Sequence, residues 1–303
     1  MAGHRIQTFL RRPWKEKVST AQFFLRRGLA ELPYLPVPIR LQVAPHEEIE
    51  LRWSYIAPFH DPNRRFFDYW GQDVAELRLL WKLLKPGMVF VDIGAYHGIY
   101  SLVAAKRMGD GGHVVAFEPS PVARRRLELH LRWNGIRSVK VESYAVSARA
   151  SDSTFFQVVS GDTTRNGLRP PSSTDVVAPV PVRTLSLDEY VVEAGLPRID
   201  VIKLDVEGGE LDVLRGAERV LREFRPIFIC EVLDPAAQAW GYRAGQTVAA
   251  LQSFDFDWFE FLPDGSLAPH QIRDCYPEVR NYLAVPREKR AALDLNPTKG
   301  TVK

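Results

Sequence analysis

Residues 88–119, MVFVDIGAYHGIYSLVAAKRMGDGGHVVAFEP, restrict the fold of this chain more than any other stretch. The run before the turn is apolar except for Asp92, which is typical of a strand buried on both faces. Gly94 and Gly98 frame a turn without a side chain at either end, and apolar residues at helical spacing follow it. A second apolar run then ends at Glu118. This strand–turn–helix–strand order predicts an α/β fold in which the two strands run parallel.

The acids and glycines of this unit indicate what kind of ligand it binds. In open parallel sheets the ligand lies beyond the carboxyl ends of the strands, and an acid after the second strand accepts hydrogen bonds from ribose; Glu118 has that position. The turn reads Asp-x-Gly-x-x-x-Gly and lacks the Gly-x-Gly-x-x-Gly pattern that lets a pyrophosphate approach a helix. An acid in the turn favours a cationic or neutral ligand, and S-adenosylmethionine fits. A strand and helix that bind no ligand are the alternative.

A second stretch, IDVIKLDVEGGELDVLRGA at 199–217, places charged side chains where another buried strand is expected to end. In an extended strand Lys203, Asp205 and Glu207 share one face, because side chains alternate. Charges in an apolar strand are costly to bury unless they are paired or functional. We expect Lys203 to keep Asp205 ionised beside the ligand cleft. A structural ion pair before a helix over 210–224 is the alternative.

Strand-like and helical runs alternate over residues 66–287, which predicts a doubly wound, mainly parallel sheet in one domain. Residues 1–65 are expected to form an N-terminal extension, with a basic helix and short strands, and residues 288–303 a flexible tail. Strands expected at 154–159 and 176–182 interrupt the alternation as a β insertion. The loop between these two strands suits a lid or an acceptor-binding element.

Composition limits the partners and the compartment. A net charge of +3 over 303 residues is too small to indicate nucleic acid, and none is expected. Cys230 and Cys275 form no disulfide framework and no zinc pattern, so a reducing cytoplasm is expected. We see no apolar run long enough for a bilayer and no secretory signal. Residues 1–35 leave two interpretations open: a helical cap on the domain, which their scattered charges favour, or weak contact with an anionic membrane.

Five motifs follow one another along the chain: VFVDIGAYHGIYS, VVAFEPSP, VRTLSLDEY, IDVIKLDVEGGELDVLRGA and RPIFICEV. In this order, over about residues 70–233, the chain resembles the FkbM family of S-adenosylmethionine-dependent methyltransferases. The resemblance implies a class I methyltransferase fold, which is Rossmann-like, and O-methylation of a hydroxyl on a sugar, glycan or secondary metabolite. Tyr96 and His97 depart from the family pattern, in which an asparagine and a small or apolar residue are common.

The resemblance also implies roles for individual residues. Around the amino-acid part of the cofactor it places Asp92, Gly94, Ala95 and Gly98. It places Glu118 on the ribose and Ala145, within residues 144–146, near the adenine. Asp205 would lie beside the cofactor's transferred methyl group, with Glu207 and Glu231 on the acceptor side.

Methyl transfer to a hydroxyl also requires a base that takes the proton. Asp205 and Glu207 are candidates by position, and His97 by its chemistry. The two acids and Glu231 offer oxygen ligands that suit Mg²⁺, although their spacing does not require a metal. Two other functions stay open: a nicotinamide-dependent oxidoreductase, disfavoured because Gly-x-Gly-x-x-Gly is missing, and a scaffold that binds S-adenosylmethionine without catalysis.

Overall fold

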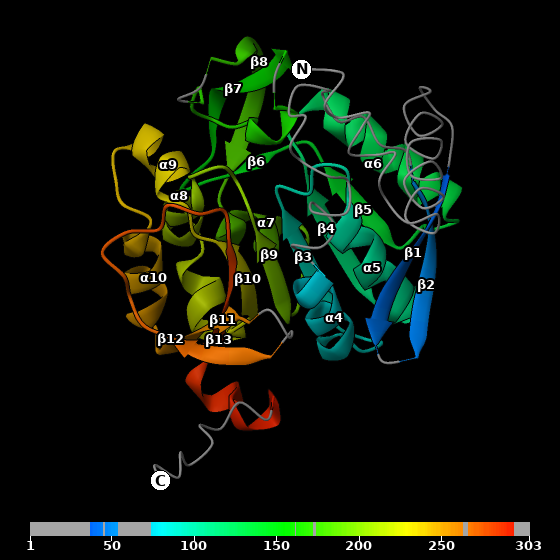
Figure 1. The fold of residues 1–303 in the computed structure, drawn as a ribbon. Coiled ribbons are helices and arrows are strands. Elements are labelled where there is room, and N and C mark those ends of the chain that lie inside the picture. Colours follow the sequence, from blue (N-terminus) through cyan, green and yellow to red (C-terminus); the bar gives the residue numbers. More distant parts are fainter. Residues whose placement is uncertain are drawn as a thin grey trace, which may run out of the picture.

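The computed structural model describes residues 37–44, 46–53, 74–160, 162–171, 174–262 and 266–293 (Figure 1). The basic helix expected within residues 1–35 and the tail from residue 294 onward lie outside the described residues. Within the described ranges, each helix is too short or too polar to cross a bilayer.

An eight-stranded sheet is the centre of the described structure, with the strand order β12-β11-β13-β10-β9-β3-β4-β5. Its contiguous parallel strands are β5 (Val139–Glu142), β4 (His113–Phe117), β3 (Val89–Ile93), β9 (Val201–Leu204) and β10 (Ile227–Glu231). The antiparallel partners that extend the β10 side are β13 (Asn281–Pro286), β11 (Phe256–Phe261) and β12 (Leu267–His270). This order confirms the predicted doubly wound, mainly parallel sheet, although β12 was not predicted.

Helices cover both faces of this sheet, so successive side chains of β3 enter different cores. Val91 belongs to the core formed with α7 (Leu187–Glu193), α8 (Glu210–Arg215) and α10 (Gly245–Gln252). Phe90 belongs to the opposite core, formed with α4 (Val74–Leu83), α5 (Ile99–Met108) and α6 (Pro121–Trp133). Burial on both faces explains why the β3 sequence is almost continuously apolar.

The short strands expected in the N-terminal extension form an antiparallel hairpin, β1 (Val37–Ala44) with β2 (Glu47–Trp53). The Trp53 ring stacks on His130 of α6 at a centroid distance of 3.9 Å. The Asn134 side chain accepts from Arg52 N and donates to Arg52 O, each at 2.8 Å. The end of β2 is therefore fastened to the end of α6.

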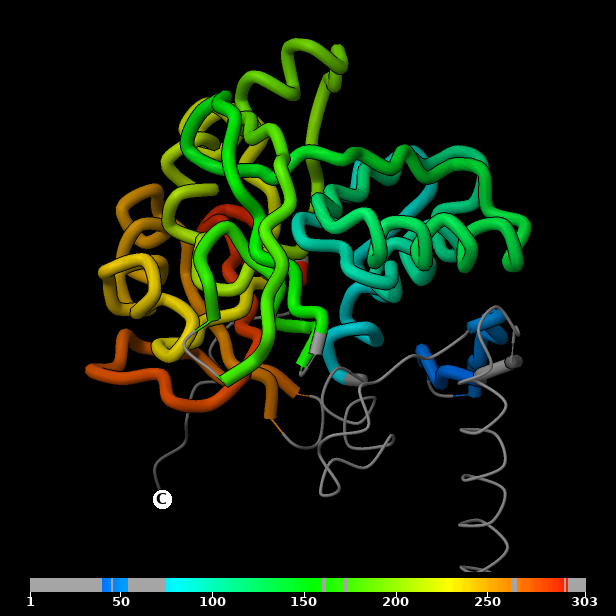
Figure 2. The backbone as a smooth tube through the Cα atoms, turned by 90° about the horizontal axis from the view of Figure 1, so that it is seen from above, coloured from blue at the N-terminus to red at the C-terminus, as the bar shows by residue number. Residues whose placement is uncertain are grey.

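The predicted β insertion is a second sheet of three strands in the order β6-β8-β7. Its members are β6 (Ala145–Val146), β7 (Ser151–Ser160) and β8 (Val176–Leu185). The antiparallel pair β7 and β8 confirms the two strands expected around the loop, and both strands lie above the main sheet (Figures 1 and 2). Residues 162–171, which begin with the short helix η2 (Thr163–Arg165), belong to the connection between them.

The prediction of one continuous helix over 210–224 is wrong, because the helix is interrupted after residue 215. Helix α8 ends at Arg215, and a π-helical turn, η3 (Val220–Phe224), follows after a break. A Cβ atom on Gly216 would lie 2.2 Å from the carbonyl oxygen of Ser147, so the backbone there packs against the insertion. Tertiary packing at this glycine overrides a continuous helical pattern.

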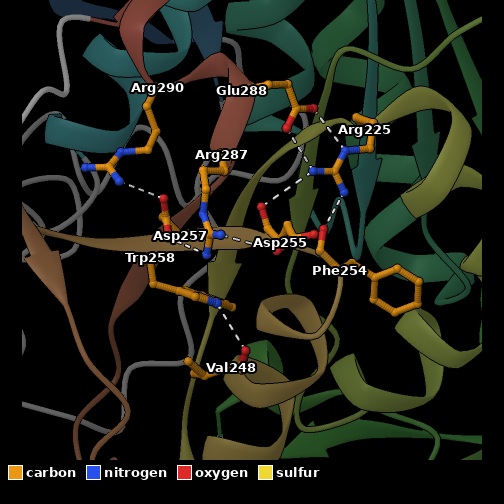
Figure 3. A network of polar contacts seen from close by, with 9 residues as sticks. All are labelled: Arg225, Val248, Phe254, Asp255, Asp257, Trp258, Arg287, Glu288 and Arg290. Carbon is orange, nitrogen blue, oxygen red and sulfur yellow. Dashed lines mark hydrogen bonds and ion pairs between the residues drawn. The ribbon is translucent and has the colours of Figure 1, made fainter.

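Polar contacts hold the end of the described chain against the main sheet (Figure 3). The Arg225 guanidinium bonds the Glu288 carboxylate at 2.9–3.0 Å and also donates to Phe254 O. Arg290 pairs with Asp257 of β11 at 2.9 Å. The segments concerned are η5 (Arg287–Lys289) and η6 (Ala291–Leu293). Structured contacts thus continue past the domain boundary expected at residue 287.

Candidate active site

A cavity of about 480 Å³ lies at the carboxyl ends of β3, β4, β9 and β10, against residues 162–171 of the insertion. Small-molecule sites commonly have volumes of about 300–1,000 Å³. Six predicted site residues line it: Gly94, Glu118, Ala145, Asp205, Glu207 and Glu231. The cavity therefore lies where ligands of open α/β sheets bind, beyond the carboxyl ends of the strands at the point where the strand order reverses, between β3 and β9.

The turn after β3 is held by its neighbours. The backbone N–H groups of Gly94 and Ala95 both donate to Phe117 O of β4 at 3.0 Å. Gly94 has φ +82°, and a Cβ atom there would lie 1.8 Å from the carbonyl oxygen of Asp205. At Gly98, with φ +86°, a Cβ atom would lie 1.9 Å from Leu127 Cδ1 of α6. Both glycines are thus required for close packing, and only Gly94 of the two lines the cavity.

Asp92, Ala95 and Gly98 lie behind the cavity wall and do not line it. Asp92 is buried within β3, and Ser101 of α5 donates a hydrogen bond of 2.6 Å to it. Burial raises the pKa of Asp92 to about 6, and the hydrogen bond from Ser101 partly opposes that rise. Asp92 therefore connects β3 to α5. It does not line the cavity, so its effect on a ligand there is indirect, through the position of the turn.

Glu118 follows β4 and closes the opposite side of the same turn. Its Oε2 accepts from Tyr96 N at 2.7 Å and its Oε1 from Ser120 N at 2.8 Å. The residue is only 4% exposed, and burial raises its pKa to about 7. Each carboxylate oxygen keeps acceptor capacity for a further donor. Glu118 thus fixes the turn and faces the cavity as an acceptor.

Three carboxylates converge on the other side of the cavity. One oxygen each from Asp205, Glu207 and Glu231 lies within 4.8 Å of the others. The prediction that Lys203, Asp205 and Glu207 alternate along one strand face is wrong, because β9 ends at Leu204 and Glu207 has φ +55°. A left-handed turn, rather than strand alternation, brings Glu207 toward Asp205.

Lys203 confirms the predicted pairing with Asp205. It is 2% exposed, and its Nζ donates to Asp205 Oδ2 and to Asn281 Oδ1, each at 2.9 Å. The ammonium also lies 5.2 Å from the centroid of the Tyr100 ring. Asn281, the first residue of β13, lines the cavity and was missed from sequence. No local pattern marks it, because its contact is made across 78 positions of the chain.

Glu207 and Glu231 share one electrostatic environment. For each carboxyl, burial is the main cause that raises the pKa well above its ordinary value, and the negative charge of Asp205 adds to the rise. Glu231 Oε2 is buried and receives no hydrogen bond among the described residues. This side of the cavity therefore favours a bound proton, or a cation, over three free negative charges.

His97 lies outside the cavity and away from the three carboxylates. Its ring stacks on Tyr96 at 3.7 Å, and its carbonyl oxygen is hydrogen bonded to His130 Nδ1 at 2.8 Å. Burial lowers the pKa of His97 well below its ordinary value. The side chain is thus a neutral member of the packing between the turn, α6 and the hairpin residue Trp53.

The insertion loop, expected from sequence to be a lid or an acceptor-binding element, adds residues to the cavity lining. The Tyr96 hydroxyl shares a hydrogen bond of 2.7 Å with Thr163 Oγ1, which ties the loop to the turn. Arg165 pairs with Asp162 and Asp175 at 3.6 Å. The Arg169 guanidinium lies 5.0 Å from the centroid of the Trp240 ring, and both residues line the cavity.

The chain is similar to known proteins over most of this region. The sequence profile described as "Methyltransferase FkbM domain" matches residues 92–265. AMB antimetabolite synthetase AmbE of Pseudomonas aeruginosa is 29% identical, over 64% of this chain and 10% of its own length. Methyltransferase sdnD of Sordaria araneosa is 31% identical, over 57% of this chain and 75% of its own length. Hexuronic acid methyltransferase AglP of Haloferax volcanii is 30% identical, over 52% of this chain and 61% of its own length. The match thus spans about a tenth of the first relative and most of the other two.

Proposed function

Because the chain belongs to the FkbM methyltransferase family, we propose that it transfers a methyl group from S-adenosylmethionine to a hydroxyl of a sugar, glycan or other small metabolite. One observation carries the proposal. A single cavity has Glu118 and the Gly94 turn on one side and the carboxylates of Asp205, Glu207 and Glu231 on the other. A donor bound on the first side presents its methyl group to an acceptor on the second.

The first side has chemistry that fits S-adenosylmethionine. Glu118 retains acceptor capacity for ribose hydroxyls, and Gly94 leaves the end of β3 open to the ligand. Tyr144, Ala145 and Val146 offer a largely apolar wall against which an adenine packs. When bound, the cofactor supplies the electrophilic methyl group, and the protein supplies alignment and electrostatics.

On the second side, Asp205 is our candidate for the base that takes the hydroxyl proton. Lys203 bonds one of its oxygens at 2.9 Å, which orients the carboxyl, and a third of the Asp205 side chain (33%) is accessible. Without a bound cation, Glu207 and Glu231 are candidates to bind other hydroxyls of the acceptor, because a protonated carboxyl donates as well as accepts. His97 receives no role in proton removal, since its ring packs outside the cavity.

The acceptor is proposed to be a polyhydroxylated molecule. Hydrogen-bonding side chains surround the acceptor side, among them Thr164, Asn166, Asp205 and Asn281. The name of the relative AglP describes a hexuronic acid methyltransferase, which supports a sugar-like acceptor. Arg169 of the insertion loop also lines the cavity, and its guanidinium favours an acceptor that bears a negative group.

Ligand binding separates this proposal from the two other functions. Calorimetry is expected to detect binding of S-adenosylhomocysteine and none of NAD⁺ to the full chain. Methyl-labelled S-adenosylmethionine is then expected to transfer its label to a metabolite in a fractionated lysate. Binding of NAD⁺ alone would favour an oxidoreductase, and binding of S-adenosylhomocysteine without transfer to any acceptor would favour a scaffold.

The affinity for S-adenosylhomocysteine is expected to fall as the pH falls through 7. Glu118 has a pKa of about 7, raised mainly by burial and by the negative charge of Asp92 and lowered by Arg124 and the two backbone hydrogen bonds. Ribose hydroxyls that donate to the carboxylate favour its ionised form, so protonation competes with binding. The ionised fraction of such a group drops about tenfold between pH 8 and pH 6, and the Kd should rise by a similar factor.

Glu118→Gln provides the control for this pH dependence, because it keeps an acceptor for Tyr96 N but does not titrate. Its Kd should be higher than that of the wild type at pH 8 and nearly constant down to pH 6. Calorimetry at three pH values would measure both proteins. Parallel pH profiles would remove Glu118 from the ribose contact.

A further inference from the structure

The three carboxylates of the acceptor side have the composition of a cation site. We propose that Asp205, Glu207 and Glu231 together bind one hard divalent cation of the Mg²⁺ type, facing the acceptor. The role of this cation in methyl transfer rests on the proposed function. The proposal that the cation binds rests only on the three carboxylates.

The carboxylate oxygens of the three residues lie nearly close enough together to bind one cation. One oxygen from each lies within 4.8 Å of the others. Oxygens on a common Mg²⁺, at bond lengths of about 2.0–2.1 Å, lie at most about 4.2 Å apart, and those on Ca²⁺, at about 2.3–2.6 Å, up to about 5 Å. Separations of up to 4.8 Å are slightly wider than three ligands of one ion adopt, so small side-chain shifts would bring the three oxygens onto a common cation.

Glu231 provides an independent indication that a ligand belongs here. Its side chain is only 7% exposed, its Oε2 receives no hydrogen bond among the described residues, and it contributes an oxygen to the cluster. A buried carboxylate oxygen without a donor is unfavourable, and a coordinated cation removes that penalty. Because Glu231 ends β10, at the floor of the cavity, the cation would lie between it and the acceptor.

The cationic side chains near the cluster already have partners, one of them within the cluster. Lys203 Nζ bonds Asp205 and Asn281, and its contact with the cluster is to Asp205 Oδ2. Arg165 forms its ion pairs with Asp162 and Asp175 in the loop. Among the described residues, Lys203 bonds one member of the cluster and Arg165 acts on Glu207 through its charge, while three carboxylates converge there. A divalent ion would offset the negative charge of the ionised cluster.

A cation in this position would act on the acceptor. Three protein oxygens leave about three of the six positions around Mg²⁺ for water or ligand oxygens. A hydroxyl bound there loses its proton more readily, because the ion stabilises the alkoxide that forms. Neighbouring hydroxyls of a sugar suit two adjacent positions, which connects the proposed cation to the proposed acceptor class.

Mn²⁺, which is paramagnetic, is the probe that tests the site. The full chain, stripped of metal with a chelator, is titrated with Mn²⁺ and followed by electron paramagnetic resonance, with Mg²⁺ as competitor. We expect one bound Mn²⁺ per chain that Mg²⁺ displaces. Glu231→Gln should weaken binding at least tenfold, because it removes a charged ligand. Glu260→Gln is the matched control: Glu260 pairs with Arg273 on the antiparallel side of the sheet and should leave affinity unchanged.

Measuring the binding of S-adenosylhomocysteine to the metal-free chain tests the proposed function independently of the cation site. If that ligand binds while Mn²⁺ at millimolar concentration does not, the cation proposal fails and the methyltransferase proposal stands. Equal Mn²⁺ affinity in the wild type and Glu231→Gln would also overturn the site. Should Glu231→Gln fail to fold, as judged by circular dichroism, Glu207→Gln provides the same test.

Discussion

Asp205→Asn is expected to lower kcat for methyl transfer by about 10²–10⁴-fold, the usual contribution of a general base, while most of the affinity for S-adenosylhomocysteine is retained. Asparagine has the shape of aspartate and can still accept a hydrogen bond from Lys203, but it cannot take a proton from the acceptor. The measurement is steady-state transfer of a labelled methyl group to the acceptor found in the lysate screen, together with calorimetry of the product.

Asp212→Asn is the matched control for this substitution. Asp212 lies in α8, pairs with Arg215 at 2.7 Å and does not line the cavity. The same chemical change there should leave kcat unaltered. If Asp205→Asn turned over as fast as the control, Asp205 would have no part in proton removal, and Glu207 would become the next candidate.

Gly94→Ala is expected to lower the free energy of unfolding by roughly 2–5 kcal/mol, the sum of a left-handed backbone penalty and an overpacking penalty. The φ of +82° disfavours any side chain, and the added Cβ would meet the Asp205 carbonyl oxygen at 1.8 Å. Because this carbonyl belongs to the residue that directly follows β9, the clash would displace Asp205 itself. Urea unfolding followed by circular dichroism measures the change in stability.

Gly87→Ala separates the two causes. Gly87 has nearly the same φ, +85°, but a Cβ atom there would have nothing within 4 Å. Gly87→Ala should therefore lower the free energy of unfolding only by the left-handed backbone penalty, roughly 1–2 kcal/mol. A loss of stability in Gly94→Ala that is no larger than in Gly87→Ala would contradict close packing between the turn and the end of β9.

The parts of the site that sequence could predict are those fixed by a few consecutive residues. The apolar run of β3, the turn at Gly94 and the acid at Glu118 follow one another within residues 88–119, and the structure has each of them as expected. Parallel strands bring their carboxyl ends to one edge, so the meeting of Glu118 and Asp205 at one cavity also followed from the predicted order.

The remaining features depend on contacts between distant segments. Asn281 reaches Lys203 only because β13 is added antiparallel beside β10. Gly216 interrupts a helical pattern because the insertion packs against it. His97 could be named as a base from its chemistry, but the packing of its ring on Tyr96, away from the cavity, is decided by α6 and the N-terminal hairpin. None of these contacts leaves a periodic signal in the sequence.

The hydroxyl pair between Tyr96 and Thr163 has a consequence for how this protein could acquire new specificities. It joins the insertion loop, proposed to lie over the acceptor, to the turn after β3, proposed to lie beside the donor, where Gly94 leaves no room for a side chain. An insertion of another length would have to keep a hydrogen bond to Tyr96 or alter the position of the turn that contains it. A change in the insertion is therefore coupled to the turn after β3 through the Tyr96–Thr163 contact, and to the segment after β4 through the hydrogen bond from Ser120 to Gln157.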